Sequence, residues 1–382
     1  MAYKMTRFTP EIWEEALDVL GSAFAYQKNG VKPDFADMYP RVFTKDARQL
    51  SDHFAAYPED KDIHGNICGC ISNCEMTYHV GNEVLKISSS GNVAVKESAR
   101  GTGLMSVMFD AVDKSLREDN FDLSYLHGAR TRYNYFGYEL CGVEYLFTFE
   151  MADLSKHYKT QNKFEFIDLS QREDLLEEAI EIINMQKVHV ERRADELIKV
   201  YRARWREPIG VFRNGQFWGS FAYGEGGIKY LSLRGYEDFA EMVYEFLLAK
   251  GLKSIPYDAP DYDKTLMHNC MKNCSSFAIG NPANFKIMHF GRVVKAFLQL
   301  KADNTPLCDG EVTLDSDLFG KYRIAIKDSK VSVEAFEGKA KYHLAGYEIY
   351  DFLFNFTPNS YGEYDPAVSS WFPMPINAPY LA

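Results

Sequence analysis

The sequence predicts a mixed α/β protein built from more than one domain. Its 382 residues are too many for one small domain. Hydrophobic residues make up 46% of the chain and aromatic residues 15%, which is enough to fill substantial cores. Helical and strand-like patterns also alternate along most of the sequence, as they do in α/β folds.

The first 150 residues contain a helix, a run of strands and a second helix. Pro10–Phe24 predicts a helix with Thr9 as its cap, because apolar residues recur there at helical spacing. Gly81-Asn82 is a hairpin turn signal between two strand patterns. A helical pattern begins again at Leu104. We predict strands at Asn66–Ser72, Cys74–Val80, Val84–Ser89, Asn92–Val95 and Asp122–His127.

A second α/β unit is predicted to begin near Phe164. It repeats the strand, strand, strand, helix, strand order of the first unit, although no Arg-x-Gly loop opens its helix, so we interpret it as a degenerate copy. The predicted helices are Gln171–Met185 and Asp238–Lys250, and the predicted strands are Ile209–Phe212, Gln216–Tyr223, Ile228–Leu233 and Lys253–Tyr257.

The last hundred residues predict a smaller antiparallel sheet with two helices. The helices are expected at Asn284–Leu300 and Tyr347–Phe356. The tail Trp371–Ala382 is rich in proline and aromatic residues, so we expect it to lie along another domain instead of exposing that apolar area. The strands are expected at Glu311–Leu314, Tyr322–Ile326, Lys330–Glu337 and Lys341–Leu344.

The net charge and the cysteines narrow the class of protein. With 43 Lys and Arg against 54 Asp and Glu, the net charge is −11, which argues against a nucleic-acid or anionic-membrane partner. The seven cysteines are an odd number, which favours a reducing cytoplasm. Cys68, Cys70 and Cys74 share a strand-like run, so we expect them to pack in a core and not to bind a metal. We find neither a signal peptide nor a membrane span.

The segment Arg100–Ser106 predicts an anion site. Gly101 and Gly103 let the backbone turn its N–H groups toward one point, and the helix that follows adds its positive end. A pyrophosphate suits such a site, and Arg100 can pair with it. A glycine turn before an ordinary helix is the alternative, but the strand before the loop and the long helix after it favour the anion site.

Two motifs resemble a known enzyme family. Val93-Ala94-Val95, followed by Ala99-Arg-Gly-Thr-Gly-Leu-Met105, resembles the acetyl-CoA loop of the GNAT acyltransferases. Tyr133-Asn-Tyr-Phe-Gly-Tyr138 is similar to the signature of their Eis (enhanced intracellular survival) branch. The resemblance implies tandem GNAT domains and a sterol-carrier-like α/β domain. It divides the chain into a catalytic domain (residues 1–152), a degenerate second domain (153–281) and a C-terminal domain with its tail (282–382).

The resemblance also implies a direct acetyl transfer from acetyl-CoA, with no metal. Tyr133 is expected to protonate the leaving thiolate, and the carboxylate of Ala382 to take the proton of the amine. For Tyr135, Phe136 and Tyr138 we expect core packing. The pantetheine arm is expected along Val93, Ala94 and Val95, and the pyrophosphate at Arg100 and the N–H groups of Gly101, Thr102, Gly103, Leu104, Met105 and Ser106.

The acceptor is expected to be a cationic amine. Residues 1–150 hold 15 Lys and Arg against 22 Asp and Glu, which favours an aminoglycoside, a polyamine or a lysine side chain. Two alternatives stay open, namely transfer of a longer acyl chain and a non-catalytic CoA- or lipid-binding protein. Relatives of the Eis branch form symmetric oligomers, so a homo-oligomer, a hexamer by resemblance, is expected.

Overall fold

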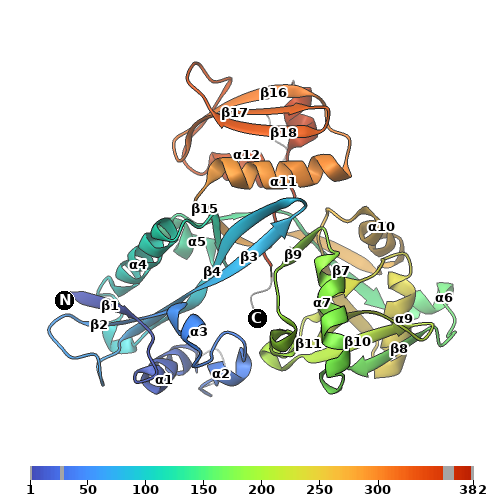
Figure 1. Cartoon of the computed structure of the whole chain (residues 1–382), viewed down its shortest axis with the longest axis horizontal. Helices are drawn as coiled ribbons and strands as arrows, with labels where there is room; N and C mark the ends of the chain where they lie inside the picture. Colours follow the sequence, from blue (N-terminus) through green and yellow to red (C-terminus); the bar gives the residue numbers. More distant parts are fainter. Residues whose placement is uncertain (1, 26–29, 356–364, 380–382) are drawn as a thin grey trace.

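The computed structural model describes residues 2–25, 30–355 and 365–379. Figure 1 shows two α/β lobes side by side and a smaller lobe of strands and helices above them. We call them the first, second and third lobes. In the described part of the chain, no helix has both the length and the apolar character that a membrane span requires.

The first lobe is built on an eight-stranded sheet. Its strand order is β1-β2-β3-β4-β5-β15-β6, and β9 pairs with β3. All pairs are antiparallel except β4 with β5. The strands are β1 (Tyr3–Arg7), β2 (His53–Pro58), β3 (Gly69–Val80), β4 (Glu83–Val95), β5 (Leu123–Leu126), β6 (Glu139–Cys141), β9 (Val188–Val190) and β15 (Ala283–Ile287).

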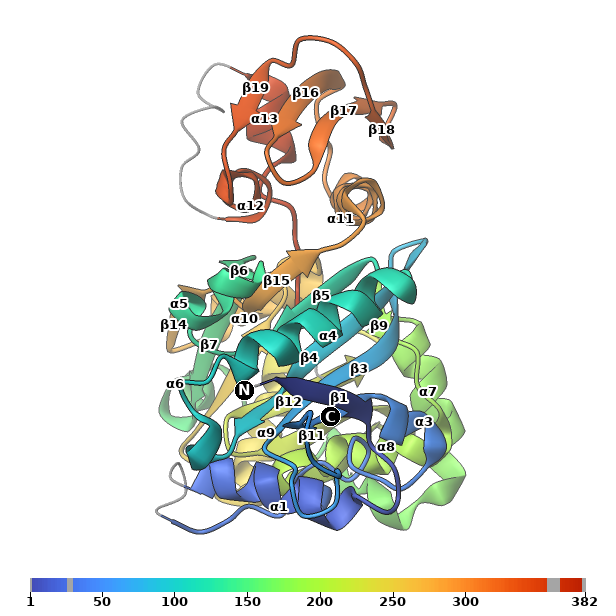
Figure 2. The same cartoon turned by 90° about the vertical axis from the view of Figure 1, so that its left-hand side faces the viewer.

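Helices cover both faces of this sheet (Figure 2). Alternation along β3 separates the two cores, because Cys70 packs with α1 on one face and Ile71 packs with α4 on the other. The helices of the first lobe are α1 (Trp13–Phe24), α2 (Phe35–Met38), α3 (Ala47–Ser51), α4 (Leu104–Glu118) and α5 (Arg130–Tyr133).

The three cysteines of the predicted core run are buried, as expected. The Sγ of Cys68 donates to the carbonyl of Ala56 at 3.3 Å, and the Sγ of Cys70 donates to that of Ala16 at 3.7 Å. Burial raises the pKa of the Cys74 thiol well above its usual value, so this group stays neutral.

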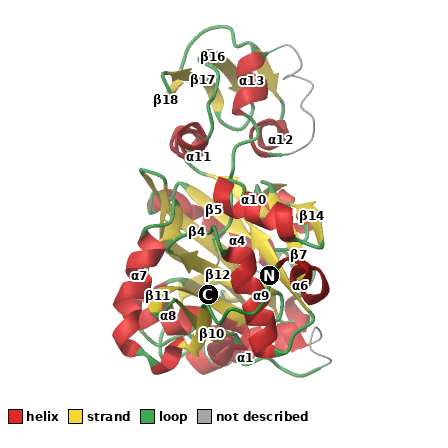
Figure 3. Cartoon of the chain, turned by 90° about the vertical axis from the view of Figure 1, so that its right-hand side faces the viewer, coloured by secondary structure: helices red, strands yellow, loops and turns green. Residues whose placement is uncertain are grey.

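The second lobe, which faces the viewer in Figure 3, holds a seven-stranded sheet. Its strand order is β14-β7-β13-β12-β11-β10-β8. Helix α9 packs on one face, and α7 and α8 pack on the other. The strands are β7 (Glu144–Glu150), β8 (Phe164–Asp168), β10 (Glu207–Arg213), β11 (Gln216–Gly224), β12 (Gly227–Leu233), β13 (Ser254–Ala259) and β14 (Ser276–Gly280). The helices are α6 (Met151–His157), α7 (Leu176–Asn184), α8 (Ala194–Tyr201), α9 (Phe239–Lys250) and α10 (Lys264–Asn273).

The third lobe has a four-stranded sheet in the order β18-β17-β16-β19, covered by helices. The prediction of a purely antiparallel sheet is wrong, because β19 pairs with β16 in parallel. The strands are β16 (Gly310–Ser316), β17 (Gly320–Lys327), β18 (Lys330–Ala335) and β19 (Tyr342–Leu344). The helices are α11 (Phe290–Asn304), α12 (Glu348–Phe354) and α13 (Pro366–Trp371).

The predicted helix Asn284–Leu300 is wrong in its first part. Residues 283–287 form β15, and the helix α11 begins only at Phe290. The apolar residues Ala283, Phe285 and Ile287 alternate with the polar residues Asn284 and Lys286, which is a strand pattern. Pairing of β15 with β5 and β6 therefore overrides the local helical pattern.

The lobes exchange strands. Strand β7 lies within residues 1–152 but pairs with β13 and β14 of the second sheet. Strand β15 lies within residues 282–382 but pairs with β5 and β6 of the first sheet. Strand β9, which precedes α8, pairs with β3 of the first sheet. The first lobe is therefore completed by segments that lie far along the chain.

The C-terminal tail descends from the third lobe between the other two, as predicted for an apolar tail. Trp371 and Ile376 are fully buried. The Nζ of Lys301 donates to the carbonyl of Pro373 at 2.9 Å. The Tyr125 hydroxyl donates to the carbonyl of Pro379 at 2.5 Å, which is the last described residue. Ala382 lies outside the described residues.

Candidate active site

A bulge in β4 opens a cleft in the first sheet. Between the pairs Cys70–Ala94 and Ser72–Gly91, β4 has one residue more than β3. Asn92 takes up this extra length with a φ of +50°, and its Nδ2 donates to the Oγ of Ser72 at 3.1 Å. Strand β4 pairs with β5 only at Ile87–Ser89. Beyond these residues β4 and β5 no longer pair with each other, and a cleft lies between their ends.

This main cleft has a volume of about 1680 Å³ and is bounded by the first and second lobes. Most of the predicted cofactor residues line it. Ala94 does not, because its methyl group packs in the core beneath α1. Thr102 and Ser106 do not line it either. The predicted residues that do are Val93, Val95, Arg100, Gly101, Gly103, Leu104, Met105 and Tyr133.

The glycine loop has the geometry of an anion site. Gly101 and Gly103 have φ of +76° and +81°, which only glycine adopts at little cost. The Oγ1 of Thr102 donates to the carbonyl of Ala99 at 2.7 Å and fixes the turn. Within the described ranges, no residue accepts a hydrogen bond from the N–H groups of residues 101–105. Five N–H groups at the start of α4 are therefore available to a phosphate group.

One predicted contributor to this loop is already engaged. The N–H of Ser106 donates to the carbonyl of Gly103 at 3.0 Å within the first turn of α4. We therefore correct the prediction for the Ser106 N–H, because a helix leaves only its first donors without internal partners.

Tyr133 lies in α5, directly beyond the end of β5, and lines the main cleft. It is 8% exposed, and its ring lies 5.9 Å from that of Phe109. Gly128 permits this position. A Cβ at residue 128 would lie 2.4 Å from the Cε2 of Tyr133, and the φ of Gly128 is +149°. Tyr133 therefore lies at the wall of the cleft that the glycine loop also lines.

The neighbouring aromatic residues differ in their surroundings. Tyr138 is fully buried, and its hydroxyl hydrogen-bonds with that of Ser124 at 2.9 Å. Phe136 stacks on Phe109 at 4.2 Å. Tyr135 is 80% exposed, so the prediction of core packing is confirmed for Phe136 and Tyr138 and is wrong for Tyr135.

The second lobe supplies cleft residues that the sequence reasoning missed. Arg204 and Arg206 line the main cleft from the segment between α8 and β10, and Lys229 lines it from β12. Burial, together with the positive charges of Arg204 and Lys229, lowers the pKa of His127 at the end of β5. The run Arg204-Trp205-Arg206 is visible in the sequence, but nothing local shows that it faces another lobe.

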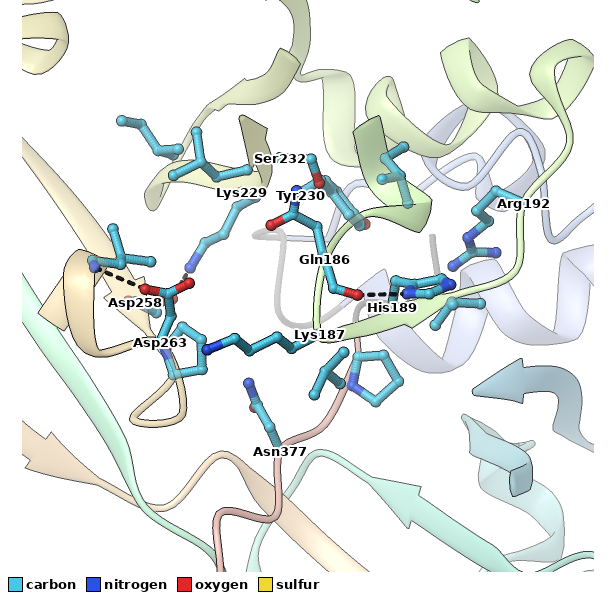
Figure 4. A pocket seen from close by; sticks show the side chains of 18 of the residues that line it. Gln186, Lys187, His189, Arg192, Lys229, Tyr230, Ser232, Asp258, Asp263 and Asn377 are labelled. Carbon is cyan, nitrogen blue, oxygen red and sulfur yellow. Dashed lines mark hydrogen bonds and ion pairs between the residues drawn. The ribbon is translucent and has the colours of Figure 1, made fainter. Parts of the chain in front are cut away.

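A smaller pocket of about 180 Å³ lies beside β12 and the tail (Figure 4). Strand β12 pairs with β13 in parallel only at Ile228 and Tyr257, and Tyr230 has a φ of +56°. The second sheet therefore repeats, at a smaller scale, the separation of β4 and β5 in the first. Lys229 forms an ion pair with Asp258 at this pocket.

Cys141, which follows the Tyr133–Tyr138 motif along the chain, does not suit covalent catalysis. Cys141 is fully buried, and burial raises the pKa of its thiol well above the usual value. A thiol kept neutral in this way is a poor nucleophile.

Comparisons with solved structures show the fold. The chain is similar to a GCN5-related N-acetyltransferase from Kribbella flavida, with a TM-score of 0.65 and 14% identity over 90% of this chain and 88% of that one. A probable N-acyltransferase from Enterococcus faecalis gives the same four values. Eis1 from Mycobacterium abscessus gives a TM-score of 0.61 and 12% identity over 90% of this chain and 87% of that one. No curated protein matches the chain.

The sequence comparison bears directly on the cleft. Residues 4–141 match the family model of the acetyltransferase (GNAT) domain, whose members use acetyl-CoA. The matched range contains the bulged strand β4, the loop Arg100–Ser106 and Tyr133. Residues 4–141 therefore form a GNAT acetyltransferase domain, and the chain is an acyltransferase.

Proposed function

We propose that this chain transfers an acetyl group from acetyl-CoA directly to an amine, as an enzyme of the Eis branch. The acceptor classes are a cationic small molecule, aminoglycoside-like or polyamine-like, and a lysine side chain. The observation that carries the proposal is the meeting of three features in one cleft. These are the open edge of β4, the free N–H groups of the glycine loop, and Tyr133.

The residues of the cleft fit acetyl-CoA. The thioester supplies an acyl group that is already activated for attack by an amine. The edge of Val93–Val95 beyond the bulge would bind the pantetheine amides, as a strand binds its neighbour. A backbone N–H of this edge would stabilise negative charge on the carbonyl oxygen. The N–H groups of residues 101–105 and the guanidinium of Arg100 would bind the pyrophosphate.

Two proton transfers complete the reaction. The amine nitrogen forms a bond to the carbonyl carbon, and the bond from that carbon to sulfur breaks. Tyr133 would give its hydroxyl proton to the departing sulfur. The carboxylate of Ala382 would take the proton that the amine loses. The tail supports this role, because Ala378 lines the main cleft and Pro379 is hydrogen-bonded to Tyr125 at its wall.

The test is release of the CoA thiol from acetyl-CoA, measured with a coloured thiol reagent against aminoglycosides, polyamines and lysine peptides. We expect Tyr133→Phe to lower kcat by about a hundredfold or more, because a general acid contributes that much. The matched control is Tyr135→Phe, which changes an exposed ring two residues away and should leave kcat unchanged.

Equal activity of wild type and Tyr133→Phe would remove Tyr133 from the mechanism. An absence of acceptor-dependent release with acetyl-CoA, together with release from a long-chain acyl-CoA, would show that the donor is a longer acyl group. The non-catalytic alternative is set aside, because the first lobe is an acetyltransferase domain.

Further parts of the proposal concern the whole protein. We propose a sterol-carrier-like character for the C-terminal domain (282–382), a cytoplasmic location, and a symmetric homo-oligomer, a hexamer by family resemblance. The division at residues 152 and 281 belongs to the same proposal. Light scattering of the purified protein measures the oligomeric state directly.

A further inference from the structure

The charges around the main cleft differ from those of the first 150 residues as a whole. That region carries an excess of acidic residues, which favours a polycationic acceptor. The wall that the second lobe adds to the cleft carries Arg204, Arg206 and Lys229. The acidic residues on the cleft lining are Glu144, Glu225 and Asp258.

Most of these acidic groups do not neutralise the arginines. Asp258 is already engaged with Lys229 in an ion pair. Burial raises the pKa of Glu144, which disfavours its charged form. The two guanidinium groups therefore present positive charge to the space in which the acceptor must lie.

Arg204 is held in place by the first lobe. Its Nε donates to the Tyr39 hydroxyl at 2.8 Å, beyond the end of α2, and its guanidinium lies 5.8 Å from the centre of that ring. Next to it, the Nε1 of Trp205 donates to the Oδ2 of Asp37 at 2.5 Å. The hydrogen bond to Tyr39 uses only the Nε of the Arg204 guanidinium. Its two Nη groups donate to none of the residues that the structure describes.

The backbone at this point is strained. Arg204 and Trp205 have φ of +57° and +58°, a region that side-chain-bearing residues rarely adopt. Two such residues in succession cost free energy, and strain of this kind gathers at binding sites. Here the strain brings consecutive side chains onto the wall of the cleft.

Arg206 adds a second guanidinium to the lining of the main cleft. Its Nη1 donates to the carbonyl of Ala203 at 3.1 Å, and its guanidinium lies 5.9 Å from the centre of the Tyr230 ring. Its Nε is buried and has no acceptor within the described ranges. Gly224 makes room for this side chain, because a Cβ there would lie 2.9 Å from the Cγ of Arg206.

Both arginines line the cleft that also holds the predicted acid Tyr133. Arg204 is near enough to His127 for its charge to act on that ring. His127 and Tyr133 both line the same cleft, beyond the end of β5. A group bound by the arginines would therefore belong to a small molecule whose amine reaches the acyl group.

From these contacts we propose that the acceptor carries a carboxylate beside its reacting amine, and that Arg204, supported by Arg206, binds this carboxylate. This inference rests on the proposed amine acetylation, but in place of the cationic acceptor classes named there it assigns an amino acid. Two parallel N–H groups match the two oxygens of a carboxylate, which gives both affinity and orientation. The second lobe thus acts as the specificity element for a reaction carried out by the first.

The experiment compares amino acids with the amines that they yield on decarboxylation. The pairs are lysine with 1,5-diaminopentane, ornithine with 1,4-diaminobutane, and phenylalanine with phenethylamine. Each pair keeps an amine and differs by the carboxylate. We expect kcat/KM for thiol release to be about ten- to hundredfold higher for the amino acid, as hydrogen bonds to a charged group provide.

The variants assign the preference to the arginine. In Arg204→Gln, the ratio of kcat/KM between the amino acid and its amine should fall close to one, mainly because the KM for the amino acid rises. Arg204→Lys should keep part of the preference for the amino acid. The matched control is Arg202→Gln, which changes an exposed arginine that contacts Ser170 outside the cleft. The KM for acetyl-CoA should stay unchanged in all three variants, whereas a rise would assign Arg204 to the phosphates of CoA and overturn the inference.

Calorimetric binding to the CoA-loaded protein separates this inference from the proposed function. Arg204-dependent binding of the amino acids without acetyl transfer would support the inference and contradict the transfer. Acetyl transfer that favours neither member of any pair would support the transfer and overturn the inference. If no acetyl transfer occurs and binding does not distinguish the members of any pair, both are wrong.

Discussion

At the end of β5, one glycine determines where the ring of Tyr133 can lie. The chain turns at Gly128 with a φ of +149°, and the ring occupies the space that a side chain at this position would need. The sequence motif identifies Tyr133, but nothing in the motif shows this contact. It becomes visible only when β5 and α5 are placed together.

We expect Gly128→Ala to lower kcat nearly as far as Tyr133→Phe does. The added methyl group would meet the ring at 2.4 Å, and the backbone conformation is unfavourable for alanine, so Tyr133 must move. Steady-state thiol release measures kcat, and calorimetry measures acetyl-CoA affinity, which should change little. Full activity of Gly128→Ala would show that the position of this ring is not critical.

A buried histidine gives the first lobe a predictable dependence on pH. His53 is fully buried, stacks on Phe43 at 4.7 Å, and hydrogen-bonds through its ring nitrogens to Ser72 and Val42. Burial lowers the pKa of His53 to about 4. An unfolded chain takes up this proton near pH 6.5. The native state therefore loses stability as the pH falls from about 6.5 to about 4.

For His53 alone, we expect this loss to reach about 3 kcal/mol in the free energy of unfolding. Urea titrations of wild type and His53→Gln at pH 7 and pH 4.5 measure it as a difference between the two proteins. Burial also raises the pKa of Asp52 to about 7, which acts with the opposite sign, but both proteins retain Asp52. A wild-type advantage that is the same at both pH values would contradict this account.

At the scale of elements, the bulge in β4 sets the direction of the edge that would bind the pantetheine arm. Asn92 adopts a positive φ, which asparagine tolerates better than β-branched residues do. Its amide also bonds to Ser72 across the bulge. The bulge thus depends on one residue whose type suits the conformation.

We expect Asn92→Val to raise the KM for acetyl-CoA, whereas Asn92→Gly should keep it within a few-fold of wild type. Valine at a φ of +50° is strained. The backbone would relieve this strain by changing the bulge, and the geometry of Val93–Val95 would change with it. Steady-state kinetics at saturating acceptor measures both variants. Equal KM values for the valine and glycine variants would show that the bulge does not position the donor.

The type and approximate position of many single helices and strands are predictable from the sequence. The pattern of Pro10–Phe24 predicts a helix, and α1 is confirmed from Trp13. The sequence predicts a separate strand at Asn92–Val95, but this segment continues β4, because a bulge keeps two strand segments in one ladder. The strand β15 could not be read locally, since its partners lie more than a hundred residues away.

The site was predictable only in part for the same reason. The loop Arg100–Met105 and Tyr133 belong to one continuous stretch with recognisable spacing, and both line the main cleft. Arg204 and Arg206 reach that cleft from another lobe, through tertiary packing that leaves no periodic signal in the sequence.

At the scale of the whole molecule, the tail connects the third lobe to the reaction centre. It passes Gly142, where a Cβ would lie 2.9 Å from the carbonyl of Ile376, and it reaches Tyr125 at Pro379. Three further residues lead to Ala382. The proposed base is therefore delivered by a segment that is anchored along its described length.

Appending two alanines after Ala382 should lower kcat about a hundredfold, because the carboxylate would be displaced from the amine. The rate of the extended protein should recover as the pH approaches the pKa of the acceptor amine, which then needs no base. Stopped assays from pH 7 to pH 10 measure this, with the same two alanines at the N-terminus as the control. Unchanged kcat in the extended protein would exclude the terminal carboxylate as the base.

The exchange of strands between lobes has a consequence for biosynthesis. A ribosome releases the chain from its N-terminus, so β5 and β6 emerge early while their common partner β15 emerges only after residue 287. Until then the edge of β5, with Leu123 and Tyr125, has no neighbour on that side. By that time every strand of the second sheet has been synthesised. The catalytic half of the protein begins to emerge first and is the later of the two to be completed.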